Sequence, residues 1–165
     1  MDPLNPEALL PTLLRQALGG TVRWRRLAGN SLILYVDHEP GDGAGLTFWF
    51  DPTWHVREPG RVLAGSREAQ FDEDDPDEQE SLERFGMRLD VLVGTTIEGV
   101  DIEPETFDLT LRLSGGYLVR TFAADSTDDR TWHIRDNAAD LALKGSPLGL
   151  AVVRPRARRP RPTPA

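Results

Sequence analysis

The pattern of apolar positions divides the chain into two similar series, each a helix followed by short strands. Apolar side chains recur at three- to four-residue spacing over residues 9–18, which predicts an amphipathic helix. Asn5 suits its capping position, Pro6 suits its first turn, and Gly19-Gly20 ends it. Pro11 lies inside the pattern, so the helix is either kinked there or begins only one residue earlier.

Five short strands are predicted after this helix. Ser31–Val36 is apolar on both faces and is therefore expected to lie in the middle of its sheet. Short glycine- and proline-bearing turns separate the segments, and such connections require antiparallel hairpins, because parallel strands need a long crossover. The predicted strands span residues 21–27, 31–36, 45–50, 54–58 and 61–65.

A second helix and a second series of strands repeat this order. Apolar side chains between Leu82 and Leu92 share one helical face, so residues 79–93 are predicted to be helical. Asp77 and Glu80 have the spacing of a capping box at the start of this helix. The predicted strands span residues 95–102, 107–113, 117–123, 131–135, 140–144 and 148–153.

The two series also share sequence. Thr131–Arg135 repeats Thr53–Arg57 with one conservative change, from Val56 to Ile134. Two flanking landmarks occur in the same order, Gly20–Val22 with Gly94–Thr96 and Leu63–Ser66 with Leu143–Ser146. The distance in sequence between matched segments changes slightly from one pair to the next. Loop insertions in a duplicated unit produce such a change, so the chain is interpreted as two tandem copies.

We therefore predict an α+β fold that is mainly antiparallel β with two helices. One globular domain is expected, built from two tandem helix-plus-β-meander repeats, 5–66 and 78–153, around a pseudo-twofold axis. Residues 67–77 are predicted to be an acidic linker between the repeats. The Arg- and Pro-rich residues 154–165 have no apolar periodicity and are predicted to form a disordered tail.

The charge of the chain is uneven and limits the partners to be expected. Residues 1–153 carry 14 basic and 27 acidic side chains, a net charge of −13. Nucleic acid is therefore not an expected partner, because its binding requires basic side chains that neutralise phosphates. No apolar run reaches the ~18 residues of a membrane span, and the first residues lack the basic segment of a signal peptide. A cytoplasmic protein without cysteine or membrane partner is expected.

The sharpest compositional feature is a run of acids in the second half of the linker. Eight acidic side chains and no basic one lie between Asp72 and Glu83. A solvated loop that leads into the helix is the plainer interpretation. The alternative is a recognition surface for a basic partner, to which Asp72, Glu73, Asp74 and Asp75 would contribute.

The repeated segment supplies both core and surface candidates. Trp54 and Trp132 are predicted to be structural, because tryptophan buries a large apolar area. The same structural role is expected for the glycines of the matched endings, Gly65 and Gly145.

Strand alternation places the polar side chains of the same segment on the opposite face from the tryptophans. His55 then lies beside Arg57, and His133 lies beside Arg135. A cation and an imidazole side by side on a sheet suit a carboxylate or a phosphate.

Other chemistries lack the necessary patterns. The three histidines have no spacing that preorganises metal ligands, so neither a metal site nor a cofactor is expected. Ser66 and Ser146 lie in Gly-Ser turns without the Gly-x-Ser-x-Gly elbow, so no residue is nominated as catalytic. The loop Gly41–Gly45 joins two predicted strands and is interpreted as a hairpin rather than a phosphate loop.

Over about residues 45–135 the chain also resembles a group of small bacterial proteins, some of which occur among immunity proteins of toxin systems. The matching positions are Trp54, Gly65, Ser66, Glu68, Leu111, Gly116, Leu118 and Trp132. The chain departs from the group's pattern at His55, where the group has Arg, and at Glu68, where it has Asp. The resemblance implies a binding role of the immunity-protein kind and carries no activity.

Functions of different classes fit these residues. The leading hypothesis is a non-enzymatic protein-binding module, immunity-like, that neutralises a basic partner. The alternative is a small-ligand-binding or enzymatic domain whose site lies between the two repeats, near His55, Arg57, His133 and Arg135. A subunit that forms a homodimer through its sheet edges is a third alternative.

Charge reversal tests the acidic segment. Changing Asp72, Glu73, Asp74 and Asp75 to lysine should weaken capture of a basic partner, and the loss should shrink as salt rises, because exposed charges are screened over about 8 Å at physiological ionic strength. Pull-downs from the native host with wild type and variant side by side measure this. Recovery of the same partners by both proteins would make the acidic run a solvated linker.

Overall fold

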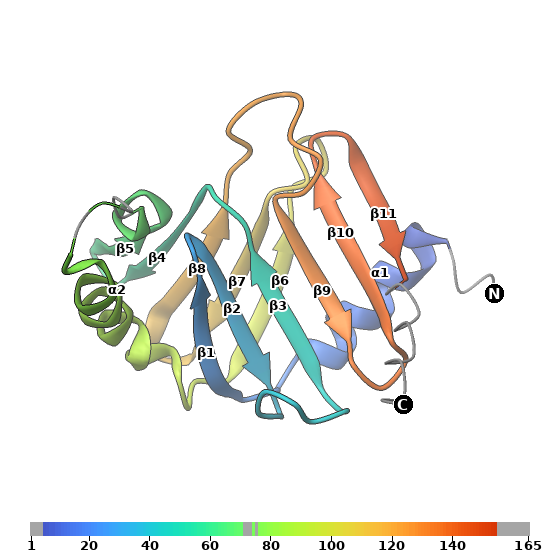
Figure 1. Ribbon diagram of the computed structural model, residues 1–165. Coiled ribbons are helices and arrows are strands. Elements are labelled where there is room, and N and C mark those ends of the chain that lie inside the picture. Colours follow the sequence, from blue (N-terminus) through green and yellow to red (C-terminus); the bar gives the residue numbers. More distant parts are fainter. Residues whose placement is uncertain (1–4, 71–73, 75, 155–165) are drawn as a thin grey trace, which may run out of the picture.

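The chain folds into two antiparallel sheets that pack face to face over one core (Figure 1). The computed structural model describes residues 5–70, 74 and 76–154. Within these residues lie two α-helices and eleven strands, so the predicted α+β class, mainly antiparallel β, is confirmed. None of the helices in this part of the chain has the length and apolar character that crossing a bilayer requires.

The first helix begins and ends where the sequence predicts. α1 spans Pro6–Ala17, and the side chain of Asn5 accepts a hydrogen bond from the backbone N–H of Glu7 at 3.0 Å. Pro11 lies inside the helix, so the helix does not begin beside it. The chain leaves the helical conformation at Leu18, immediately before the two glycines.

The second helix is present, but its predicted capping box is wrong. α2 spans Glu78–Met87 and continues as the 3₁₀ helix η2 over Arg88–Leu92. Asp77 has φ −100° and ψ 11° rather than the extended conformation of a capping residue, and its side chain makes no capping hydrogen bond. Glu80 pairs instead with Arg84 one turn along, at 2.8 Å.

Every predicted strand is present, with ends shifted by at most two residues. The strands are β1 (Val22–Ala28), β2 (Ser31–Val36), β3 (Leu46–Phe50), β4 (Trp54–Glu58), β5 (Arg61–Gly65), β6 (Ile97–Ile102), β7 (Leu109–Leu113), β8 (Tyr117–Thr121), β9 (Trp132–Asp136), β10 (Leu141–Ser146) and β11 (Gly149–Val153). A short 3₁₀ helix, η1 (Ser66–Ala69), occupies the start of the predicted linker, and another, η3 (Ser114–Gly116), joins β7 to β8.

The two halves of the chain, β1–β5 before α2 and β6–β11 after it, each contribute strands to both sheets instead of forming two separate meanders. The first sheet has the order β1-β2-β3-β9-β10-β11 and the second has the order β5-β4-β8-β7-β6. Each half gives its first three strands to one sheet and its remaining strands, two in the first half and three in the second, to the other, so the predicted self-contained meanders are wrong. A flat five-strand meander would leave its apolar face uncovered, whereas this exchange makes each half cover the other.

Apart from β11, which has no counterpart in the second sheet, the two sheets have the same order when every strand number is moved five positions. The order β1-β2-β3-β9-β10 becomes β6-β7-β8-β4-β5, which is the second sheet read from its other edge. An isolated antiparallel bridge joins Thr21 to Thr96 where the halves meet. Matched backbone hydrogen bonds surround this bridge: Val22 N to Thr95 O (2.9 Å) and Ile97 N to Gly20 O (2.8 Å), then Gly94 N to Val22 O (2.8 Å) and Gly19 N to Ile97 O (2.9 Å).

The equivalent tryptophans occupy equivalent places, and each ties one sheet to the other. Trp54 begins β4 and Trp132 begins β9, and each is only 1% exposed. The indole N–H of Trp54 donates to the backbone oxygen of Asn30 at 2.7 Å, and that of Trp132 donates to Phe107 at 2.6 Å. Asn30 precedes β2 and Phe107 precedes β7, so both acceptors lie at corresponding turns of the opposite sheet. That the halves arose as tandem copies stays a prediction.

The strand register corrects one detail of the sequence correspondence. Gly65 lies opposite His55 in the β4–β5 pair, whereas Lys144 lies opposite His133 in the β9–β10 pair. The structural counterpart of Gly65 is therefore Lys144, not Gly145.

The helices close the two open sides of the sandwich. α1 contacts β6, β10 and β11, while η2 contacts β1 and β5 at the opposite side (Figure 1). Buried Leu13 and Ala17 carry α1 into the core, and Phe85, Leu89 and Leu92 do the same for the second helical segment. The core is thus continuous from one helix through both sheets to the other.

The two glycines nominated as structural have different surroundings. A methyl group at Gly145 would overlap the Trp132 ring, while one at Gly65 would lie at an ordinary 3.6 Å from the backbone oxygen of Trp54. Gly145→Ala should therefore lower the free energy of unfolding by about 1–3 kcal/mol, as overpacked cores do. Gly65→Ala is the matched control and should change it by less than about 1 kcal/mol. Equal urea midpoints for the two variants would contradict this packing.

Candidate functional site

The outer face of the first sheet carries a row of chemically active side chains. Across neighbouring strands, Lys144 on β10 lies opposite His133 on β9, which lies opposite Trp49 on β3. The rings of Trp49 and His133 stack with their centroids 5.2 Å apart and their planes at 21°. The buried Trp132 and Ile134 point the other way, so the predicted alternation of β9 is confirmed.

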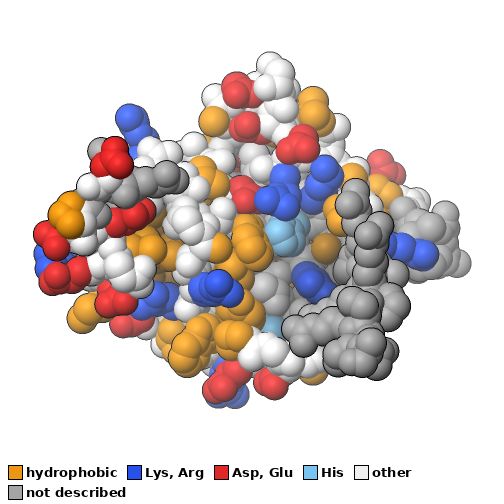
Figure 2. Space-filling model, viewed as in Figure 1, with side chains coloured by type: hydrophobic (Ala, Val, Ile, Leu, Met, Phe, Trp, Pro, Cys, Tyr) orange, Lys and Arg blue, Asp and Glu red, His pale blue; other side chains and the backbone are white. Residues whose placement is uncertain are grey.

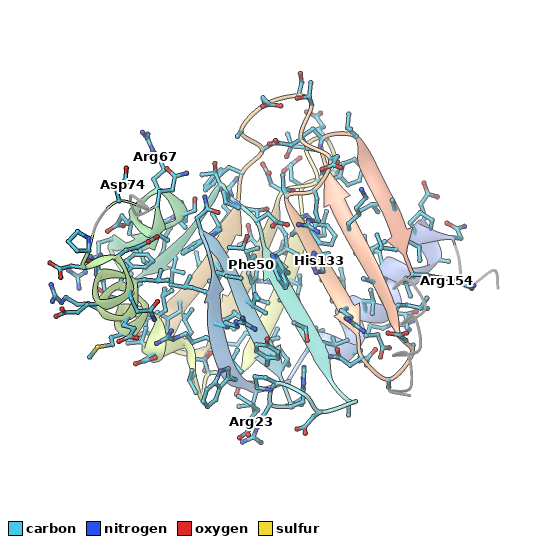
Figure 3. The ribbon with its side chains drawn as sticks, in the orientation of Figure 1. Arg23, Phe50, Arg67, Asp74, His133 and Arg154 are labelled. Atoms are coloured by element: carbon cyan, nitrogen blue, oxygen red, sulfur yellow. The ribbon has the colours of Figure 1, made fainter. Side chains whose placement is uncertain are left out.

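A pocket of about 740 Å³ opens beside this row. Figure 2 views this face and shows Lys and Arg side chains on either side of a histidine, and Figure 3 labels His133 there, beside the end of β3. The pocket is lined by Asp51, Pro52, Asp129, Arg130, His133, Arg135, Ala142, Lys144 and Val153. Three of these side chains are cationic and two are acidic, a local net charge of +1 on a chain whose total is −8.

Asp51 anchors the rear wall of the pocket. Its Oδ1 accepts hydrogen bonds from the hydroxyl of Ser31 and the indole N–H of Trp49, each at 3.1 Å. Its Oδ2 forms an ion pair with Nε of Arg130 at 2.7 Å, and Nη2 of Arg130 donates a hydrogen bond to Oδ1 at 3.4 Å. The carboxylate is thus fully engaged, and it fixes both Arg130 and the Trp49 ring.

The other two cations pair with exposed carboxylates rather than with a buried one. Arg135 pairs with the exposed Asp140 through Nη2 at 2.7 Å, and Lys144 reaches Asp129 only at 4.0 Å. Exposed pairs of this kind contribute about 0–1 kcal/mol, so a ligand anion can compete for both cations.

Two buried nitrogens of the pocket residues have no hydrogen-bond partner among the described residues. They are Nδ1 of His133 and Nε of Arg135. Most buried polar groups in native proteins are paired, and an unpaired one costs about 1–3 kcal/mol. The sheet therefore holds unused hydrogen-bonding capacity next to the pocket.

His133 is neutral under ordinary conditions. Its pKa is lowered to about 4, mainly by burial and to a smaller extent by the positive charges of Arg130 and Arg135. A neutral imidazole offers one donor and one acceptor, so it adds polarity and a flat surface to the pocket without adding charge.

The structure does not bring the four predicted His and Arg residues together. His55 and Arg57 lie on β4 in the second sheet, and their core-facing neighbours are Trp54 and Val56. Because the sheets pack through their tryptophan-bearing faces, His55 and His133 lie on opposite outer surfaces. The predicted site between the two repeats, shared by both His–Arg pairs, is therefore wrong. Because β4 and β9 lie in different sheets, the two pairs face outward in opposite directions.

The remaining predicted residues do not join the pocket. Asp72, Glu73 and Asp75 lie outside the described residues, and the described Asp74 is an exposed turn residue. His38 is buried in the β2–β3 connection, where its Nε2 lies 3.0 Å from the backbone oxygen of Leu46. His38 is thus a structural part of that hairpin.

Sequence reasoning missed Asp51, Arg130, Lys144 and Trp49. Asp51 lies in the predicted turn between the strands 45–50 and 54–58, and Arg130 precedes the repeated segment without belonging to it. The available signals were the outward position of Trp49 under strand alternation and the fact that Lys144 is the chain's one lysine.

Comparison of the chain with protein-family models, curated proteins and solved structures gave no match. The geometry of the described residues is therefore the basis for any functional proposal.

The lowered pKa of His133 makes stability depend on pH. Since the unfolded state, with a pKa near 6.5, binds the proton more tightly than the folded state, with a pKa of about 4, this contribution is fully present above pH 6.5 and is lost as pH falls toward 4. Relative to His133→Gln, the wild type should lose about 2 kcal/mol of unfolding free energy between pH 7 and pH 5. Urea titrations of both proteins test this, and parallel pH curves would contradict it.

Proposed function

We propose that the protein is a non-enzymatic binding module that holds a carboxylate or phosphate group of a small ligand in the pocket beside His133. The observation that supports this most is the convergence of Arg130, Arg135 and Lys144 on one cavity of an acidic protein. Two of these cations, Arg135 and Lys144, are paired only with exposed aspartates, so an incoming anion can compete for their charge.

The size of the pocket favours a small molecule. Its volume of about 740 Å³ falls within the range of roughly 300–1,000 Å³ typical of ligand sites. Pro52, Ala142 and Val153 give the pocket apolar lining, and the imidazole of His133, which stacks on Trp49, gives it a planar one. A ligand with an anionic group and an apolar or planar body matches these walls.

The chemistry of the pocket favours binding over catalysis. A general base works best when its pKa lies near the working pH, and that of His133 is about 4. Asp51 is occupied by Ser31, Trp49 and Arg130. None of the described lining residues is a serine, threonine or cysteine, so the lining offers no hydroxyl or thiol nucleophile.

The chain's three histidines provide a direct test, because each reports on a different part of the molecule. His133 reports on the pocket, His55 on the opposite sheet and His38 on a buried hairpin. Titration with inorganic phosphate or with succinate at fixed pH and ionic strength should shift the imidazole NMR signal of His133 with saturation. The signal of His38 should stay unchanged.

Matched variants make the assignment specific. Arg135→Gln and Lys144→Gln should each weaken the His133 response about tenfold, because one charge-assisted hydrogen bond is worth about 1.5–3 kcal/mol. Arg84→Gln removes a cation that belongs to an exposed ion pair on α2 and should leave the response unchanged. A His133 signal that does not saturate, or that responds equally in all variants, would contradict the proposal.

The protein-binding hypothesis stays a prediction. It depends on charge in the segment 72–83, and three of its first four acids lie outside the described residues. The pocket and the acidic segment are separate in sequence, so charge reversal of the segment and substitution of the pocket test the two functions independently.

A further inference from the structure

The second sheet repeats the chemistry of the pocket at the corresponding place. His55 is the second residue of β4, as His133 is the second residue of β9, and Arg57 follows it two positions later, as Arg135 follows His133. His55 lies opposite Arg120 on β8, the position that Trp49 occupies on β3 opposite His133. In the first sheet the cation opposite the histidine is Lys144 on β10, and in the second sheet it is Arg120 on β8.

The two arginines beside His55 have no carboxylate partner among the described residues. No ion pair involves Arg57 or Arg120 within the part of the chain that the structure describes, although eight other basic side chains there are paired. Both lie close enough to lower the pKa of His55, after the larger effect of its burial. Two like charges at one place in an otherwise acidic chain repel each other, and an anion between them would relieve that repulsion.

The geometry places both guanidinium groups within reach of one ligand. Arg57 lies opposite Leu118, so Arg57 and Arg120 are diagonal neighbours, about 7–8 Å apart at their backbones. Arg120 lies over the ring of Phe122 at 5.0 Å, which orients it on the sheet surface. Diagonal arginines on long side chains can close on one oxyanion from two sides.

The surroundings of His55 leave this place open on one side. Phe122 packs edge-on against the imidazole at 4.7 Å, and the opposite flank is Gly65, which has no side chain. At the same place in the first sheet stands Lys144. Nε2 of His55 is buried and has no hydrogen-bond partner among the described residues, just as Nδ1 of His133 has none.

We propose that Arg57 and Arg120, beside His55, form a second oxyanion site on the opposite face of the molecule. The pocket beside His133 has two carboxylates in its lining, whereas neither Arg57 nor Arg120 is paired with a carboxylate of the described residues. The second site therefore prefers a doubly charged, tetrahedral group of the phosphate kind over a single carboxylate. The chain can then hold two anionic groups at once, one on each outer surface.

The test uses the full chain and follows the His55 NMR signal. Inorganic phosphate, added at constant pH and with sodium chloride holding the ionic strength fixed, should shift the His55 signal with saturation, and acetate should shift it at least about tenfold more weakly. Arg120→Gln should weaken the phosphate response of His55 about tenfold and leave that of His133 unchanged. Arg112→Gln is the matched control, because Arg112 lies on the neighbouring β7 and is paired with Asp101 at 3.0 Å.

The outcomes separate this proposal from the pocket. A saturating response at His133 with none at His55 would refute the second site and leave the pocket standing, and the reverse result would do the opposite. The second site is also refuted if Arg120→Gln and Arg112→Gln affect the His55 response equally. If Arg120→Lys keeps the phosphate response of His55, the positive charge is what binds the anion. If Arg120→Lys loses that response, the forked donors of the guanidinium group are required.

Discussion

The structure depends on two buried indole N–H groups that must find partners. Trp54 and Trp132 are fully enclosed, and a buried donor without an acceptor costs about 1–3 kcal/mol. Each finds its acceptor on the other sheet, at the turn before β2 or before β7. The indole hydrogen bonds therefore fix the distance and register between the sheets, and the exchange of strands between the halves places each tryptophan where it can make one.

The surface chemistry follows from the same constraint. With Trp and Val or Ile held inward along β4 and β9, strand alternation turns the histidine and arginine of each copy outward. Because β4 and β9 lie in different sheets, the outward pairs lie on opposite faces. Neighbouring strands then distinguish the two places. Trp49 on β3 and Lys144 on β10 flank His133 beside the pocket, while Arg120 on β8 and Gly65 on β5 flank His55 on an open surface.

The sequence predicts the elements well and their partners poorly. Periodicity located both helices and all the strands, because those signals are local: the Asn5 cap, the apolar stripe of α1 and the apolar β2. Periodicity could not show that the chain passes to the other sheet after Phe50. The strand that pairs with β3 is β9, which lies more than 80 positions further along the chain, and a local pattern does not specify such a partner. For the same reason His133 and Arg135 were found from their alternation, whereas the contributions of Asp51 and Lys144 depend on a neighbouring strand that local pattern does not specify.

The central claim is that the cationic groups on the outer sheet faces bind oxyanions, and a heavy tetrahedral oxyanion can be located directly. Diffraction from crystals soaked in tungstate would give anomalous peaks at its bound positions. The account predicts a peak in the pocket within hydrogen-bonding distance of Arg135 or Lys144, and a second between Arg57 and Arg120. Peaks confined to crystal contacts or to arginines elsewhere, with both places empty, would contradict it.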